Sequence, residues 1–262
     1  MKKNTFLASL ISILMTFFMM GGTQAHADNE IIVSAAVSLK NAFEDTGRIF
    51  RERHPDAKLL FNFGASGDLA RQIEAGAPVD VFASAAQKDM DDLDRKGMIV
   101  KGTRKDFAGN GIVLIIPIKS AIHPTSFNDL RRGKIQKIAL GNPKTVPAGR
   151  YSEEVLRYFD LWDAVKDRLI FAENARQVLD YVARGEVDAG MVYSTDAFIR
   201  AKEVKIVAEA PIESHQPVIY PIALVKGSRK EFLSKEFILI VVSKDGKKVL
   251  EKYGFIVSHE DQ

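Results

Sequence analysis

The segment at residues 58–83 constrains the fold of this chain more than any other. An alternating apolar run at 58–63 predicts a β-strand, and the small residues 64–67 (GASG) follow it. Apolar residues at helical spacing in 69–73 then predict a short helix that Gly76 ends. A helix that begins in a small-residue loop presents free backbone N–H groups and the positive end of its dipole. The segment therefore predicts half of an oxyanion site.

The same alternation of strand and helix continues on both sides of this segment. A strand at 31–36 and a helix at 39–53 precede it, and a helix at 87–96 follows it. Strands that alternate with helices are typical of an α/β domain with a mostly parallel sheet. From residue 107 a buried apolar strand follows a Gly/Asn turn, which predicts the start of a second lobe.

A long apolar strand at 218–225 indicates that the chain returns to the first lobe. We therefore expect two α/β lobes joined by crossings near 106–108 and 209–213. The expected first lobe comprises residues 28–106 together with 212–262, and the second comprises residues 107–211.

The N-terminus has the pattern of a signal peptide. Lys2 and Lys3 precede an almost wholly apolar run at 6–20, and Ala25-His26-Ala27 fits a small-x-small cleavage site. We expect residues 1–27 to be removed by cleavage after Ala27, which predicts export to the periplasm. A retained membrane anchor is the alternative, although the apolar run is short for a membrane span.

The composition excludes several classes of function. The chain has no cysteine, which excludes disulfides, thiol catalysis, Cys-based metal sites and a lipid-anchored mature N-terminus. The formal net charge is only +3, and two of the positive charges are Lys2 and Lys3. No basic stripe with interleaved aromatic residues occurs, so nucleic-acid binding has no support.

Four segments share the design of a strand, a small-residue loop and a helix N-terminus, centred on Ser38, Ser66, Ala148 and Ala175. Two of them lie in each expected lobe. Ligands of open α/β sheets bind outside the carboxyl ends of the strands, so two facing lobes would bring the four helix starts together. The ligand that suits them is a small anion held by neutral N–H and O–H donors. Tyr193, at the end of another strand, could add a phenolic donor.

A secreted serine hydrolase that uses Ser66 is an alternative of a different class. Residues 64–68 (GASGD) nearly match the nucleophile elbow, but the fifth position is aspartate where the motif has glycine. The histidines of the mature chain lie near turns or the terminus, and they lack the spacing of a metal site. This pattern does not favour a catalytic triad or a metal centre.

The chain resembles the periplasmic molybdate-binding proteins of ABC importers across essentially the whole mature length. The matching segments are 35–39 (AAVSL), 69–80 (LARQIEAGAPVD), 146–149 (VPAG), 190–197 (GMVYSTDA) and 253–255 (YGF). The resemblance implies a two-lobed type II periplasmic binding fold, with mixed sheets flanked by helices and the ligand cleft between the lobes. It also implies a protein that is not an enzyme and needs no cofactor or resident metal.

The resemblance further implies the ligand, the partners and the site. The ligand would be molybdate or tungstate, held without counter-charges, and the partners would be the membrane permease subunits of an ABC transporter. The protein itself would be a monomer. Matched motif by motif, the ligand positions fall on Ser38, Ser66, Ala148, Ala175 and Tyr193, with the two alanines donating through main-chain N–H groups.

Asp68 leaves the identity of the oxyanion open. This chain has Gly67-Asp68 where family members often carry a Ser/Thr-rich run. A carboxylate that faces the site would suit a protonated oxyanion such as hydrogen phosphate, whereas molybdate and sulfate need donors only. A carboxylate that points outward from the first turn would be stabilised by the helix dipole instead. Sulfate and phosphate therefore remain alternative ligands, and a receptor-like signalling module on the same fold is a third possibility.

Overall fold

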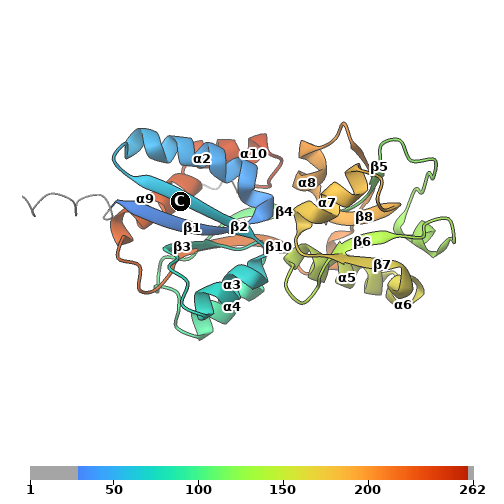
Figure 1. The fold of residues 1–262 in the computed structure, drawn as a ribbon, viewed down its shortest axis with the longest axis horizontal. Helices are drawn as coiled ribbons and strands as arrows, with labels where there is room; N and C mark the ends of the chain where they lie inside the picture. Colours follow the sequence, from blue (N-terminus) through green and yellow to red (C-terminus); the bar gives the residue numbers. More distant parts are fainter. Residues whose placement is uncertain (1–28, 259–262) are drawn as a thin grey trace, which may run out of the picture.

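The computed structural model describes residues 29–258, so the predicted signal peptide at 1–27 lies outside the described residues. Figure 1 shows two lobes side by side along the long axis. No helix among residues 29–258 is long and apolar enough to cross a membrane.

The first lobe is built on a five-stranded mixed sheet in the order β2-β1-β3-β10-β4. Strands β1, β2 and β3 are parallel, and β10 runs antiparallel to both β3 and β4. The helices α2, α9 and α10 cover one face, and α3 and α4 cover the other (Figure 1). The elements are β1 (Glu30–Ala36), the 3₁₀ turn η1 (Val37–Leu39), α2 (Lys40–Arg53), β2 (Lys58–Gly64), α3 (Ser66–Glu74), β3 (Val81–Ala83), α4 (Gln87–Arg95), β4 (Lys105–Asn110), β10 (Val218–Leu224), α9 (Glu231–Val242) and α10 (Lys244–Lys252).

The second lobe repeats this topology in the order β7-β6-β8-β5-β9. Here β6, β7 and β8 are parallel, and β5 runs antiparallel to β8 and β9. The elements are β5 (Ile112–Pro117), η2 (Phe127–Arg131), β6 (Ile138–Gly141), α5 (Pro147–Tyr158), α6 (Trp162–Val165), η3 (Lys166–Arg168), β7 (Leu169–Ala172), α7 (Ala175–Ala183), β8 (Ala189–Tyr193), α8 (Ser194–Ile199) and β9 (Val204–Glu209), with η4 (Ile212–Ser214) in the return connection.

The strand registers align the loops that follow the strands. In the first lobe, Ala36 at the end of β1 pairs with Gly64 at the end of β2. In the second lobe, Gly141 at the end of β6 pairs with Ala172 at the end of β7. Because paired strand ends lie at one edge of a sheet, η1 begins beside α3, and α5 begins beside α7.

The chain crosses between the sheets later than the sequence pattern indicated. The expected limit after Asp106 falls inside β4, which pairs with β10 of the first sheet as far as Asn110. The second sheet begins with β5 at Ile112, so the crossing lies at Gly111. The expected apolar strand after the Gly/Asn turn is confirmed as β5, and the residues before the turn form β4 of the first sheet. The return lies between β9 and β10, and the expected limit after Pro211 falls within it.

The lobes are held by apolar packing on both faces of each sheet. Val33 and Ala35 are buried on one face of β1 and Ser34 and Ala36 on the other, which fits a strand covered by helices on both sides. Phe43 of α2 packs edge-on against Phe237 of α9, with ring centroids 5.6 Å apart. The expected stop of α3 is confirmed, since Gly76 follows the helix with φ of +87°, which glycine adopts most readily.

Candidate functional site

Ser38 lies in the turn that connects β1 to α2. Its side chain is buried, and its Oγ is hydrogen-bonded to the phenol oxygen of Tyr220 at 3.2 Å. Tyr220 belongs to β10, so the serine is held against its own lobe. The N-cap position of the turn is Ala36, and Ser38 makes no capping hydrogen bond. Its hydroxyl is therefore not used by the local helix start.

Ser66 is the first residue of α3 and is completely buried. The backbone N–H of Ala85, in the loop after β3, donates a hydrogen bond of 3.0 Å to its Oγ. A backbone N–H can only donate, so Ser66 accepts here and keeps its own hydroxyl hydrogen for another partner. No hydrogen bond joins Ser66 to a histidine among residues 29–258. A nucleophilic serine needs an adjacent base, so the contacts of Ser66 do not support hydrolase chemistry.

The two predicted alanines begin helices of the second lobe. Ala148 follows Pro147, which occupies the first position of α5, and Ala175 is the first residue of α7. Both alanines are buried. In α7 the N-cap side chain of Asn174 accepts from the N–H of Gln177 at 3.0 Å. The N–H groups of a first turn have no intrahelical acceptor, so both alanines offer the main-chain donors that the sequence predicted.

Tyr193 ends β8 and reaches the first lobe. Its hydroxyl donates to the carbonyl oxygen of Ala85 at 3.3 Å. The side chain is buried, and burial raises the pKa of the phenol well above its usual value. Tyr193 therefore remains a neutral donor at neutral pH.

The structure brings these positions together at the facing edges of the two lobes. Ala85 connects Ser66 and Tyr193, because its N–H bonds the serine and its carbonyl oxygen accepts from the tyrosine. The N–H of Gly67 donates to the carbonyl oxygen of Thr145 at 3.0 Å, which joins the start of α3 to the loop before α5. The start of α7 lies against η1, which carries Ser38.

The carboxylate of Asp68 does not face this site. Its side chain is 39% exposed and forms an ion pair with Arg71 on the same helix. The carboxylate lies in the first turn of α3, where the helix dipole favours negative charge. Of the two orientations left open by the sequence, the structure has the outward one.

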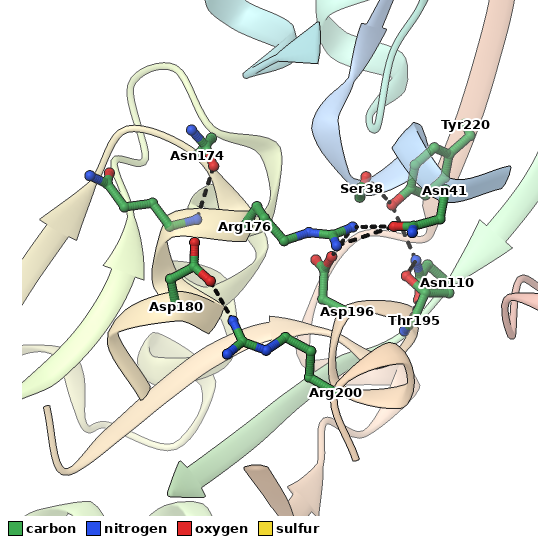
Figure 2. A network of polar contacts seen from close by, with 11 residues as sticks. Ser38, Asn41, Asn110, Asn174, Arg176, Asp180, Thr195, Asp196, Arg200 and Tyr220 are labelled. Carbon is green, nitrogen blue, oxygen red and sulfur yellow. Dashed lines mark hydrogen bonds and ion pairs between the residues drawn. The ribbon is translucent and has the colours of Figure 1, made fainter. Parts of the chain in front are cut away.

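A buried amide that sequence reasoning missed lies at the crossing between the lobes. The Nδ2 of Asn110 donates to Thr195 Oγ1 at 2.8 Å and to the Tyr220 hydroxyl at 3.1 Å (Figure 2). Its Oδ1 accepts from the Ser194 hydroxyl at 2.8 Å and from the N–H of Gly111 at 3.0 Å. The N–H of Gly111 can only donate, which fixes the orientation of the amide. An Asn-Gly step after a strand could have signalled only a turn.

A buried ion pair lies beside the predicted position at Ala175. Arg176 Nη2 is 3.4 Å from Oδ1 of Asp196, and the guanidinium also donates to Asn41 Oδ1 of the first lobe at 3.2 and 3.3 Å (Figure 2). Within the described part of the chain, neither oxygen of Asp196 has a hydrogen-bond partner. Burial raises the pKa of Asp196 to about 6, and the charge of Arg176 opposes this shift.

A second arginine joins the lobes on the side of α5. Arg150 Nη2 forms an ion pair at 2.5 Å with Asp89 of α4, and the side chains are 18% and 7% exposed. Burial raises the pKa of Asp89, and the neighbouring guanidinium lowers it. Arg150 and Arg176 therefore each have a carboxylate partner, which offsets their positive charge near the helix starts.

Comparison with known proteins assigns the chain to a family. A family model described as bacterial extracellular solute-binding protein matches residues 31–256. The chain belongs to this family. It is 40% identical over 235 residues to the molybdate-binding protein ModA of Haemophilus influenzae, covering 87% of this chain and 91% of that one. It is 36% identical over 247 residues to ModA of Escherichia coli, covering 92% and 94%.

The solved structures agree with this assignment at the level of the fold. The periplasmic molybdate-binding protein of Azotobacter vinelandii superposes with a TM-score of 0.78, at 22% identity, over 87% of this chain and 100% of that one. The predicted two-lobed fold with mixed sheets and the predicted class of solute-binding protein are confirmed. The extracellular family also agrees with the predicted export.

Proposed function

We propose that this solute-binding protein captures molybdate in the cleft between its lobes and delivers it to the permease subunits of an ABC importer. Tungstate, which has the same shape and charge, is bound as well. The protein acts as a monomer after cleavage behind Ala27 and needs no cofactor. The named function of relatives at 36–40% identity supports the ligand.

The observation that carries the proposal is the set of buried neutral donors at the facing edges. Ser38, Ser66, Ala148, Ala175 and Tyr193 are all buried, and they come from both lobes. Ser66 already accepts from Ala85, and its hydroxyl hydrogen has no acceptor among the described residues, so it is available to donate to a ligand. Asp68 points away. Such a set suits an oxyanion without a proton, and molybdate has none at neutral pH.

Titration calorimetry of the mature protein with molybdate, tungstate, sulfate and phosphate tests the ligand. We expect tight binding of molybdate and tungstate and weak or undetectable binding of phosphate. In thermal unfolding, a ligand at 100 times its dissociation constant should add about 2.7 kcal/mol of stability. Binding of phosphate without binding of molybdate would assign the protein to phosphate uptake and contradict the proposal.

Two substitutions test the proposed site. Ser66→Ala and Tyr193→Phe each remove one donor to a charged acceptor and should weaken molybdate binding by ~1–3 kcal/mol. Ser234→Ala is the matched control, because Ser234 is fully buried in α9 and its hydroxyl has no hydrogen-bond partner among residues 29–258. Unchanged affinity in both site variants would place the ligand elsewhere.

A further inference from the structure

The hydrogen-bond pattern around Ser38 indicates whether the site can bind an oxyanion that carries a proton. A serine hydroxyl can donate one hydrogen bond and can also accept. A site that must reject a protonated oxyanion has to leave the hydrogen of each serine no acceptor except the ligand. For Ser66 the N–H of Ala85 donates to the Oγ, and among residues 29–258 the hydroxyl hydrogen of Ser66 has no acceptor. For Ser38 the neighbour is the Tyr220 hydroxyl, whose direction of donation follows from the groups behind it.

The amide of Asn110 sets that direction. Its Oδ1 faces the N–H of Gly111, so its Nδ2 must point toward Thr195 and Tyr220. An amide NH₂ can only donate, so the Tyr220 hydroxyl oxygen is an acceptor in this contact. The hydrogen of Tyr220 is then directed to its remaining partner, the Oγ of Ser38 at 3.2 Å.

Asn110, Tyr220 and Ser38 form a relay of hydrogen bonds that is shielded from water. All three residues are buried, so each polar atom has to find its partner within the protein. Burial keeps Tyr220 protonated, because it raises the pKa of the phenol far above its usual value. Its hydrogen is therefore present at neutral pH.

We propose that Asn110 and Tyr220 are positioning residues that make Ser38 a pure donor and so set the specificity of the site against protonated oxyanions. This inference rests on the proposed function, since it assigns Ser38 to the ligand. The order of donation is Asn110 to Tyr220, Tyr220 to Ser38, and Ser38 to an oxygen of the ligand. A protonated oxygen of the ligand that faced Ser38 or Ser66 would leave the hydrogen of that serine without an acceptor, which is unfavourable in a buried site.

Two anions of equal shape separate the effect of a proton on the ligand from the effect of cavity size. Selenate and arsenate are tetrahedral and nearly equal in size, but at pH 7 only arsenate carries a proton. Their affinities are obtained by competition against molybdate, so that weak binding is still measured. In the wild-type protein, selenate should compete better than arsenate by at least tenfold.

Two variants test the relay in different ways. Asn110→Asp replaces the donor by an acceptor, so Tyr220 turns its hydrogen toward residue 110 and its oxygen accepts from Ser38, which leaves Ser38 able to accept from a protonated ligand. In this variant we expect arsenate to gain on selenate by roughly tenfold. Tyr220→Phe removes the hydroxyl but gives the Ser38 hydrogen no new acceptor, so the ratio should stay close to that of the wild type. Tyr253→Phe is the control, because its hydroxyl bonds Asp45 at 2.8 Å away from the site.

The outcomes distinguish this inference from the proposed function. General damage to the fold weakens the binding of both anions alike and leaves the ratio of their affinities unchanged, so this ratio reports the relay alone. Arsenate that does not gain on selenate in folded Asn110→Asp overturns the relay, even when molybdate still binds. If Asn110→Asp fails to fold, the wild-type ratio decides, because arsenate that competes as well as selenate contradicts the relay. A wild-type protein that binds no molybdate, selenate or arsenate overturns the proposed function itself.

Discussion

At the scale of single residues, the carboxylate of Asp196 is the buried charge with the poorest compensation. Its ion pair with Arg176 is 3.4 Å long, and among the described residues its oxygens accept no hydrogen bond. Burial favours the neutral form of a carboxyl group, which explains the raised pKa, and the charge of Arg176 opposes this shift.

This pKa predicts a pH dependence of stability. The pKa of Asp196 is about 6 in the folded protein against an ordinary value of 3.8. The stabilisation from the protonated carboxyl is therefore fully present below about pH 4 and is lost as pH rises through about 6. The unfolding free energy of the wild type, minus that of Asp196→Asn, should fall by about 2 kcal/mol from pH 4 to pH 7.

Urea unfolding of both proteins at the two pH values measures this difference. The subtraction cancels the titration of the other carboxylates, which the two proteins share. A difference that does not change with pH would show that Asp196 is ionised throughout this range.

At the scale of elements, α4 and α5 are joined across the lobes by Asp89 and Arg150. Arg150→Gln leaves the Asp89 carboxylate buried without its partner when the lobes are in contact, at a cost of ~3 kcal/mol. Separation of the lobes would return Asp89 to water, so the variant should favour the separated arrangement. We expect weaker molybdate binding, mainly through faster dissociation in stopped-flow measurements.

The matched control for this variant lies on the same helix. Arg157 of α5 pairs with Glu153 on the exposed surface of the second lobe, and its side chain is 55% exposed. Exposed pairs of this kind contribute little, so Arg157→Gln should bind molybdate with the wild-type rates. Equal rates of molybdate dissociation from the two arginine variants would show that Arg150 does not stabilise the contact between the lobes.

Most of the helices and strands could be predicted from the sequence, because the patterns that indicate them are local. The helix starts at η1, α3, α5 and α7 follow from small-residue loops and apolar spacing over a few neighbouring residues. The crossing at Gly111 was expected a few residues too early, because β4 (KDFAGN) has few apolar residues and its pairing with β10 is a long-range contact. The relay was not predictable, since Asn110 and Tyr220 are 110 residues apart in the chain.

The positions of the candidate site could be predicted from the sequence, but the orientations of its side chains could not. The helix starts indicated four positions, a strand end added Tyr193, and the family resemblance assigned all five to the ligand. The structure places these positions at the facing edges of the lobes. The orientation of Asp68 depends on its pairing with Arg71, and the polarity of Ser38 depends on residues of two other strands. These features arise from tertiary packing, which a single sequence does not display.

At the scale of the whole molecule, the lobes meet through a close backbone contact at Gly67. A Cβ atom built on this residue would lie 2.7 Å from the carbonyl oxygen of Thr145. Backbone atoms cannot turn away as a side chain can. Gly67→Ala should therefore prevent full contact between the lobes and weaken molybdate binding at least tenfold, while alanine stabilises the helix itself by up to ~1 kcal/mol.

Small-angle X-ray scattering with and without molybdate checks this expectation. The wild type should become more compact on binding, and Gly67→Ala should not. Gly133→Ala serves as the control, because a Cβ at that position meets no atom within 4 Å. Full compaction of Gly67→Ala with molybdate would show that the contact with Thr145 is not required.

The central claim is that buried neutral donors from both lobes surround a proton-free oxyanion. A crystal structure of the mature protein with molybdate tests it most directly. We predict oxyanion oxygens within about 2.7–3.2 Å of the hydroxyls of Ser38 and Ser66, the main-chain N–H groups of Ala148 and Ala175, and the hydroxyl of Tyr193. An oxyanion bound elsewhere, or one that faces a carboxylate in the cleft, would contradict the account.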